Sequence, residues 1–346
     1  MERFDVHIKS LAKRLVCQPQ ETLLEMLERY GYRMPRSCRN GVCEICEYQL
    51  LSGVVTQRYP EKSLSCTKNE TPVIGLACTS TPLSEIWVNI KGLKSPGEQS
   101  VKRFSCDIEQ VEKLSYDVFK VSLSLPATAS KAVSFHAGQY LEIFLPDGRQ
   151  AAFSIGSAPE QGRKLELHVR LNTQSDLSAA ILEHLTTQPS VEIELPKGSC
   201  FVQASQISDD SPIVLVAAST GFAQIKSMVE HLIANQVANP IHIYWGARIA
   251  ADIYMPDLPK AWVQQYANIV YHPVVSEPSA QCGWAGRVDL LPAAICADFP
   301  ALDNVQVYAS GSPAMVYALL DACEAKGLPE SSMHSDVFAY APRPKK

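Results

Sequence analysis

The 346-residue chain shows three successive patterns of hydrophobic and polar positions. Within residues 1–91, the alternating run "RFDVHI" predicts a strand, and "ETLLEMLERYG" places its leucines at helical spacing before Gly31, a typical helix-ending residue. The run "EYQLLSGVV" predicts a hairpin that turns at Ser52-Gly53, and "SEIWVNI" predicts a closing strand. Residues 92–100 are rich in Gly, Pro, Ser and Lys, which predicts a linker.

Short β-type runs follow one another at close intervals in residues 101–205. They are separated by turn residues such as Pro146-Asp147-Gly148, and one helical segment fits near "LSAAILEHL". Several short strands at this spacing predict a small antiparallel β-barrel. The runs are "FSCDIEQVEKL", "DVFKVSLSL", "QYLEIFLPDGRQAAFSIG", "KLELHVRL" and "SVEIEL".

Residues 206–346 alternate between apolar strands and amphipathic helices. "PIVLVAAS" is apolar at nearly every position, which is typical of a parallel strand covered on both faces. "IHIYWGA", "NIVYHPVV" and "NVQVYAS" predict further strands of this kind, and "GFAQIKSMVEHLIAN" and "SPAMVYALLDACEAKG" predict helices. The alternation predicts a doubly wound parallel-sheet α/β domain.

The charge and composition of the chain argue against some classes of protein. The net charge of −5 and the pI of about 5.9 argue against a nucleic-acid-binding protein, which would usually present a basic face. No apolar run approaches the roughly 18 residues of a membrane span, and the N-terminus lacks the apolar segment of a secretory signal. We therefore expect a cytoplasmic protein without a membrane span, in which clustered cysteines are more often metal ligands than disulfides.

Three of the eleven cysteines fall in the stretch "SCRNGVCEIC". Cys38, Cys43 and Cys46 are spaced C-x4-C-x2-C, the plant-type [2Fe–2S] pattern, and Cys78 is the candidate fourth ligand. Gly41 supplies a position that bends without a Cβ clash. Zinc is the alternative metal, but it usually takes two short cysteine pairs and only one is present. Cys66 is a competing candidate for the fourth ligand.

The motif "CRNGVCEIC…C" resembles that of plant-type ferredoxins, and the whole chain resembles the three-domain iron–sulfur flavoprotein reductases. This family includes reductase components of multicomponent oxygenases and the CDP-6-deoxy-glucoseen reductases. The resemblance implies a multidomain α+β and α/β fold: a β-grasp ferredoxin domain (1–91), an FAD-binding barrel (101–205) and an NAD(P)-binding domain (206–346). It also implies that NADH or NADPH gives a hydride to FAD, which passes single electrons to a [2Fe–2S] cluster and then to a partner oxygenase or dehydratase.

The flavin motif of the family resembles "AAFSIGS", residues 151–157. The resemblance implies that Phe153 stacks on the flavin and that Ser154 is a catalytic residue near the flavin N5. Ala151 replaces the arginine that meets the flavin phosphates, and Arg149 is the expected substitute. A second stretch, "HVRLNTQSDLS", matches the family but has Gln174 and Ser175 in place of Gly-Gly. Further implied flavin-site residues are Ile155, Gly156, Ser157, His168, Val169, Arg170 and Ser178.

Three stretches resemble the family's nicotinamide motifs. "AASTGFAQ" has Ser219 and Gln224 where the family has Gly and Pro, and "YASGSPAMV" has Ser310 where most relatives have Cys. The resemblance implies a catalytic position for Ser310, and it implies that the "DVF" segment is a strand that closes the site. NADH is favoured over NADPH because no Ser/Arg pair that could bind a 2′-phosphate follows "YWGA". The implied coenzyme-site residues are Thr220, Gly221, Phe222, Gly246, Arg248, Gly311, Ser312, Pro313, Met315, Asp336 and Phe338.

Two other functions fit the same sequence. One is a reductase that acts directly on small molecules such as free flavin, quinones or ferric chelates. The other is a redox-sensing electron carrier whose flavin site has decayed, because Ala151, Gln174, Ser219 and Ser310 all depart from cofactor-facing motifs. The sequence identifies neither the terminal electron acceptor nor the oligomeric state.

Overall fold

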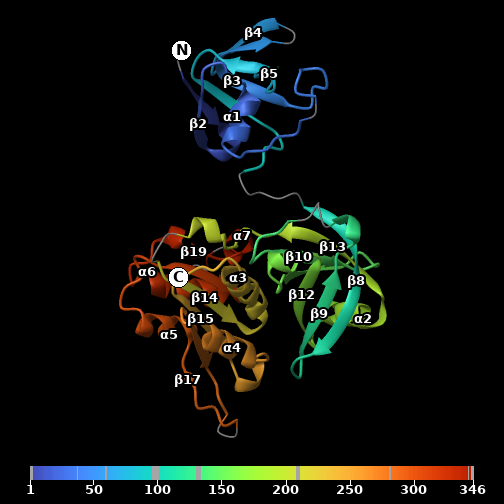
Figure 1. The fold of residues 1–346 in the computed structure, drawn as a ribbon, viewed down its shortest axis with the longest axis vertical. Coiled ribbons are helices and arrows are strands. Elements are labelled where there is room, and N and C mark those ends of the chain that lie inside the picture. Colours follow the sequence, from blue (N-terminus) through green and yellow to red (C-terminus); the bar gives the residue numbers. More distant parts are fainter. Residues whose placement is uncertain are drawn as a thin grey trace. The chain divides into compact units, whose positions relative to one another are not determined.

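The computed structural model describes residues 3–36, 38–58, 61–95, 101–129, 134–207, 211–279, 282–341 and 343. The chain divides into two compact units, Met1–Gln99 and Ser100–Lys346 (Figure 1). Among the described residues, no helix is both long and apolar enough to cross a membrane.

The first unit is a mixed sheet with one helix packed against it. Strands β1 and β7 are parallel, the other pairs are antiparallel, and the order is β2-β1-β7-β3-β4, with β5 and β6 also paired to β3. The apolar face of helix α1 packs into the core beneath the sheet. The elements are β1 (Phe4–Ile8), β2 (Lys13–Cys17), α1 (Leu23–Arg29), β3 (Glu47–Arg58), β4 (Glu61–Cys66), β5 (Val73–Leu76), β6 (Ser80–Pro82) and β7 (Ile86–Asn89).

Local sequence explains how α1 begins and ends. The Thr22 hydroxyl accepts the N–H of Glu25, and the Glu25 carboxylate accepts the N–H of Thr22, which together form a capping box. Gly31 follows the helix with a φ of +79°, a conformation that glycine adopts without a Cβ clash. The predicted helix is therefore confirmed.

The predicted hairpin at Ser52-Gly53 is wrong. Strand β3 continues through this dipeptide to Arg58, where it pairs with Glu61 of β4. Gly53 has a φ of +105°, and the register with β7 shifts between Leu50 and Ser52, which marks a β-bulge. A glycine inside a strand and a glycine in a turn give the same local sequence signal.

Six antiparallel strands form the first half of the second unit, in the order β11-β10-β13-β8-β9-β12. The two edge strands meet where the N–H of Gly156 donates to the carbonyl of Glu166 at 2.6 Å. This contact closes the sheet toward a barrel, as predicted. The elements are β8 (Lys102–Lys113), β9 (Val118–Ser124), β10 (Tyr140–Phe144), β11 (Gln150–Ser154), β12 (Lys164–Arg170), α2 (Asp176–Thr187) and β13 (Ser190–Lys197).

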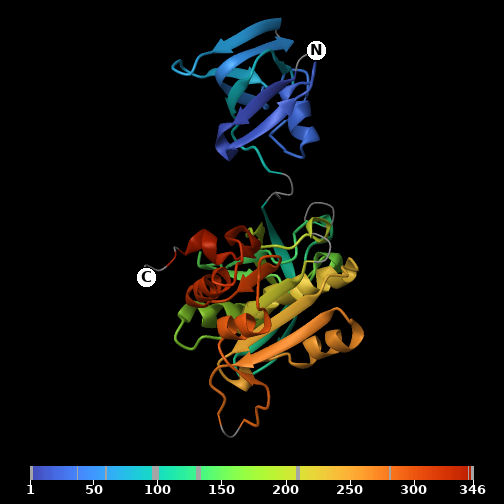
Figure 2. The ribbon, with the colours of Figure 1, turned by 90° about the vertical axis from the view of Figure 1, so that its left-hand side faces the viewer.

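A parallel sheet in the order β17-β16-β15-β14-β18-β19 forms the second half (Figure 2, yellow to red). Ile213 and Leu215 of β14 share a core with α3 and α4, whereas Val214 and Val216 share one with α5 and α6. The strand is covered on both faces, which confirms the prediction. The elements are β14 (Ile213–Ala218), α3 (Phe222–Ala234), β15 (Ile241–Ala247), α4 (Asp257–Gln265), β16 (Ile269–Val275), β17 (Arg287–Val288), α5 (Leu291–Asp298), β18 (Gln306–Ser310), α6 (Pro313–Glu324), β19 (Met333–His334) and α7 (Val337–Tyr340).

Buried polar contacts join the barrel to helix α3. Lys226 is 4% exposed, and its ammonium donates to the Gly156 carbonyl and pairs with Glu166 at 3.2 Å and Glu230 at 2.8 Å. The Ser227 hydroxyl donates to the Ser157 carbonyl at 2.8 Å. These contacts hold the end of β11 against the carboxyl edge of the parallel sheet, where α/β proteins bind their ligands.

Candidate cofactor sites

The four cysteines predicted as cluster ligands lie in two contacting pairs. Cys46 and Cys78 are buried, and their sulfur atoms are 3.3 Å apart. Cys38 and Cys43 each receive the backbone N–H of the other on sulfur, at 3.3 and 3.5 Å. The structure thus gathers three sulfurs from the loop before β3 and one from the segment after β5.

The loop backbone presents N–H groups to these sulfurs. Arg39, Gly41 and Glu44 all have positive φ values, 60°, 83° and 57°, which give the loop its tight turns. Backbone N–H groups of this loop, with the Asn40 N–H foremost, lower the pKa of the Cys38 thiol to about 6. Such a nest of donors favours thiolate and sulfide charge, so the residues present fit a [2Fe–2S] cluster.

Cys78 and Cys66, the two candidates for the fourth ligand, lie in different surroundings. Burial, followed by contact with Cys46, raises the pKa of the Cys78 thiol to about 12. Ligation to iron would hold that sulfur as a thiolate, because metal binding displaces the proton. The Cys66 sulfur instead contacts the carbonyls of Thr67 and Thr71. This placement favours Cys78 over Cys66 as the fourth ligand.

A central cavity of about 430 Å³ brings together three predicted motifs of the second unit. It is lined by Phe153 and Ser154 from the end of β11 and by the two strand-to-helix turns at residues 219–221 and 310–312. His168 and Arg170 of β12 complete the wall. A flavin ring on β11 and a nicotinamide at the sheet edge would therefore share one space.

Gly221 is required by the close approach of β18. A Cβ at this position would lie 2.5 Å from the carbonyl oxygen of Ser310, a distance that side-chain movement cannot relieve. Ser219, which replaces a glycine of the family pattern, has a φ of +54°. Its hydroxyl accepts a hydrogen bond from Arg170 at 2.5 Å, and its carbonyl accepts one from Trp245 at 3.1 Å. These contacts fix a conformation that serine rarely adopts.

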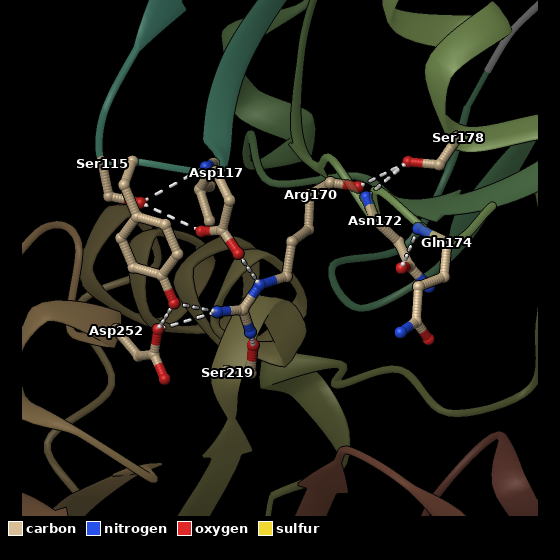
Figure 3. Close-up of polar contacts among 10 residues, drawn as sticks. Ser115, Asp117, Arg170, Asn172, Gln174, Ser178, Ser219 and Asp252 are labelled. Atoms are coloured by element: carbon tan, nitrogen blue, oxygen red, sulfur yellow. Dashed lines mark hydrogen bonds and ion pairs between the residues drawn. The ribbon is translucent and has the colours of Figure 1, made fainter. Parts of the chain in front are cut away.

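Arg170 lies at the centre of a polar network that joins the barrel to the sheet (Figure 3). Its guanidinium pairs with Asp117 at 2.6 Å and Asp252 at 2.7 Å, and Tyr116 donates to the same Asp252 oxygen. Arg170 therefore holds the junction together and is matched by two carboxylates. Sequence analysis did not identify Asp117 or Asp252, because neither lies in a recognisable motif.

The C-terminal segment differs from the prediction. The "DVF" residues are not a strand: β19 ends at His334, and Val337–Tyr340 form the short helix α7. Phe338 packs against Tyr317, with ring centroids 5.6 Å apart, and lines none of the cavities described here. Tyr340, which the sequence analysis did not single out, lines a second cavity of about 430 Å³ with Ser154 and Ser310.

Asp336 anchors this second cavity. One carboxylate oxygen accepts the N–H groups of Ser199 and Cys200, and the other accepts the Gln224 side chain at 3.0 Å. Burial raises the pKa of Asp336 despite these donors. Gln224, which replaces a proline of the family pattern, also donates to the Gly138 carbonyl at 2.6 Å, so the replacement ties α3 to the barrel.

A third cavity of about 570 Å³ opens at the carboxyl ends of β14, β15 and β16. Gly246, Arg248 and Met315, all predicted coenzyme-site residues, line it. Asp252 and Asp289 add negative charge to its wall. The Arg248 side chain is 70% exposed and lies 3.9 Å from Glu277, so its guanidinium is little constrained by the protein.

Several predicted site residues already contact other side chains or the backbone of the protein. Ile155, Val169 and Phe222 are buried, and Phe222 stacks on Trp245 with ring centroids 3.7 Å apart. Burial lowers the pKa of His168, whose ring nitrogens contact Tyr254 and Glu166 at 2.8 Å. Gly156 and Ser157 contact neighbouring strands, and Ser312 and Pro313 begin α6.

The residues predicted for the flavin phosphates are arranged differently. Arg149 lies in the turn before β11 and pairs with Asp147 at 2.6 Å. Ser178 stands in the first turn of α2, where its hydroxyl donates to the Arg170 carbonyl. The ring end of the site therefore fits a flavin, whereas the phosphate end lacks an available cation among the described residues.

Comparisons with known proteins agree with these sites. Residues 6–83 match the 2Fe-2S iron–sulfur cluster binding domain family, residues 105–201 the oxidoreductase FAD-binding domain family and residues 215–320 the oxidoreductase NAD-binding domain family. CDP-6-deoxy-L-threo-D-glycero-4-hexulose-3-dehydrase reductase of Yersinia pestis is 32% identical over 92% of this chain and 93% of the relative. The chain belongs to the iron–sulfur flavoprotein reductases.

Two further matches of this reductase extend over nearly its whole length. Terephthalate 1,2-dioxygenase reductase component 1 of Comamonas sp. is 30% identical over 97% of this chain and 98% of the relative. The crystal structure of an Amycolatopsis cytochrome P450 reductase has a TM-score of 0.66 and 26% identity, and the match covers 96% and 98% of the two chains. The predicted family, fold class and cofactors ([2Fe–2S], FAD and NAD(P)H) are confirmed, and the individual cofactor-binding residues stay predictions.

Proposed function

We propose that this reductase passes electrons from NADH through FAD to the [2Fe–2S] cluster and then to a partner protein, the dehydratase or oxygenase component of a multicomponent system. The observation that carries this proposal is the central cavity, which Ser154 of the flavin strand and Ser310 of the nicotinamide turn both line. FAD, when bound, accepts two electrons together and releases them singly.

The protein's own residues position and shield the reacting groups. Ser154 would place its hydroxyl beside the flavin N5, and Ser310 would position the nicotinamide from the turn after β18. Gly221 admits the coenzyme closely because it carries no side chain. Asp336 and Tyr340 bound the adjoining cavity, where the aromatic ring would limit water access to the flavin. In this proposal Cys38, Cys43, Cys46 and Cys78 hold the cluster.

NADH is the proposed coenzyme because the sheet-edge cavity is mainly acidic. Asp117, Asp252 and Asp289 line it, and Arg170 is already paired with the first two. Only the exposed Arg248 remains as a cation for a 2′-phosphate, among the described residues that line this cavity. A doubly charged phosphate is therefore weakly supported there.

In this proposal, electrons leave the protein at the loop that carries Cys38, Cys43 and Cys46, the cluster loop. Val42 and Ile45 lie on either side of Cys43 with 79% and 50% of their surface exposed, so apolar surface lies beside this predicted ligand, and we propose that a partner docks there. The first unit carries 13 Lys and Arg against 11 Asp and Glu, and the second 18 against 25. The net negative charge of the chain thus belongs to the second unit, so we propose a partner face that is apolar and mildly acidic.

We also propose a cytoplasmic location. None of the eleven cysteines forms a disulfide, which accords with a reducing compartment.

Cys43→Ser tests the electron path. Under anaerobic conditions, NADH should bleach the flavin and cluster absorption bands of the native protein. The variant should lose partner-dependent turnover by about 100-fold or more, because its cluster is disrupted, and keep NADH-driven reduction of a dye within about threefold. Cys66→Ser is the matched control, since its sulfur lies outside the loop. Full partner-dependent turnover in Cys43→Ser would contradict the path.

A further inference from the structure

Helix α2 begins beside the strand that carries the flavin-ring residues. Ala151 of β11 and Leu177 of α2 pack against the same core, and the Asp176 carboxylate contributes to raising the pKa of Arg149. If a flavin ring lies on Phe153 and Ser154, its phosphates would reach toward this helix start. A helix N-terminus with open N–H groups is a good pyrophosphate site.

In the loop that leads into α2, several N–H groups are already bonded within the loop (Figure 3). Of the first N–H groups of the helix itself, that of Ser178 is capped by a side chain. The Asn172 N–H donates to the Ser178 hydroxyl at 2.8 Å, and the Gln174 N–H donates to the Asn172 side chain at 3.0 Å. The Ser175 N–H donates to the Asn172 carbonyl, and the Ser178 N–H donates to the Ser175 hydroxyl at 3.3 Å. An arriving pyrophosphate would have to displace contacts that the loop already makes.

The charges at this end also oppose a phosphate. Asp176 places an exposed carboxylate in the first turn of α2, where a helix favours anions. Arg149 is paired with Asp147 and also faces Asp176. Ala151 supplies no charge. The negative phosphates would therefore meet one carboxylate already in place and a guanidinium that is already neutralised.

We propose that this flavin site selects the isoalloxazine ring and ribityl chain and gains little from the pyrophosphate. FMN and riboflavin then bind about as tightly as FAD, and bound flavin exchanges with free flavin. The inference rests on the proposed function only for the position of the ring. It is tested by binding, so it can fail while the electron path stands.

The first test needs no substitution. Full-length protein with its cluster intact and its flavin removed is titrated with FAD, FMN and riboflavin, and binding is followed by quenching of flavin fluorescence. The three dissociation constants should agree within about tenfold. They should also change little when the salt concentration rises from about 0.05 to 0.5 M, because a charge-driven contact would be screened. FAD binding tighter than riboflavin binding by about 100-fold or more would overturn the inference.

Ala151→Arg supplies the missing cation. This variant should lower the dissociation constant of FAD by about tenfold and leave that of riboflavin unchanged, because riboflavin has no phosphate. Gln150→Arg is the matched control: it adds the same charge on the opposite face of β11 and should alter neither value.

Asp176→Asn gives an independent check at an exposed position, in case the half-buried Ala151 does not accept an arginine. It should tighten FAD and FMN binding by about threefold and leave riboflavin binding unchanged. Equal changes for all three flavins in Asp176→Asn would contradict the inference. Binding of no flavin by the native protein would overturn both the inference and the proposed electron path.

Discussion

Helices α3 and α2 both begin after a β-strand at a place where a pyrophosphate is expected, yet their first turns are built differently. At α3, the N-cap is Gly221, no side chain caps the helix, and the first turn contains no acidic residue. At α2, the Ser175 hydroxyl occupies the N–H of Ser178, and Asp176 lies in the first turn. The strand–turn–helix pattern alone therefore does not make an anion site. The site also depends on the side-chain caps and charges of the first turn.

This contrast indicates that the nucleotide-binding half of the second unit recognises phosphate charge, whereas the flavin-binding half does not. The nucleotide half begins α3 without a side-chain cap or an acidic residue, beside two cavities, whereas the flavin half keeps the ring cavity and places a Ser175 cap and Asp176 at the start of α2. Arg170 joins the two, because its carbonyl accepts from Ser178 and its guanidinium donates to Ser219 (Figure 3). The experiments below separate the contributions of the two turns.

The largest expected effect comes from adding a side chain at Gly221, in the turn that begins α3. Gly221→Ala should slow NADH-driven flavin reduction by about 100-fold or more, because the new Cβ would lie 2.5 Å from the Ser310 carbonyl and push the turn into the cavity. Stopped-flow absorbance at the flavin band measures this rate. The control is Gly162→Ala, where a Cβ would meet nothing within 4 Å: its φ of +69° should cost about 1–2 kcal/mol of stability, but the rate of flavin reduction should stay native. A native rate in Gly221→Ala would mean that the coenzyme does not approach this turn.

Arg170→Ala removes the residue shared by both turns. We expect the free energy of unfolding to fall by about 2 kcal/mol, because Asp117 and Asp252 lose their cation in a partly buried site. Urea unfolding of the full chain measures this change. Arg170→Lys can keep one of the two ion pairs and should cost about half as much. No loss in Arg170→Ala would show that the two turns are held independently.

The contrast between α2 and α3 was partly visible in the sequence. The cysteine spacing, the runs of strands and the residues Gln174, Ser175 and Ser219 were all recognised as features of the motifs. What those residues contact was not, because Ser219 finds Arg170 from a strand 49 positions away. A motif records which residue types are present, whereas hydrogen-bond saturation depends on partners that the fold brings together.

The errors in the sequence analysis have the same origin. Ser52-Gly53 has turn composition but lies in a bulge of β3, which is fixed by pairing with β7. The "DVF" segment resembles a closing strand of the family but forms the start of helix α7, because Asp336 binds the backbone at Ser199 and Cys200 from the barrel. Local propensity is weak over such short segments, and tertiary contacts decide the outcome.

His168 lies on β12, and its titration makes the stability of this region depend on pH. Burial lowers its pKa, so the folded protein keeps it neutral where the unfolded chain would bind a proton. Stability should therefore fall as the pH decreases below the unfolded pKa of about 6.5, because the unfolded chain then binds a proton that the folded protein does not. His242, His272 and His334 also have lowered pKa values and add to the trend. His168→Gln should reduce the slope of urea stability against pH, and an unchanged slope would exclude His168 as a contributor.

The smallest expected effect concerns Arg248, and it tests whether the start of α3, which has no side-chain cap, is sufficient for the pyrophosphate. Arg248 is 70% exposed and only weakly paired, so it is placed to meet a 2′-phosphate rather than the groups common to both coenzymes. Arg248→Ala should raise the KM for NADPH by about fivefold and leave the KM for NADH within about twofold, since an exposed guanidinium contributes about 1 kcal/mol. Steady-state dye reduction with each coenzyme measures both values. An equal rise for NADH and NADPH would show that Arg248 contacts the pyrophosphate, and the start of α3 would then need a cation to bind it.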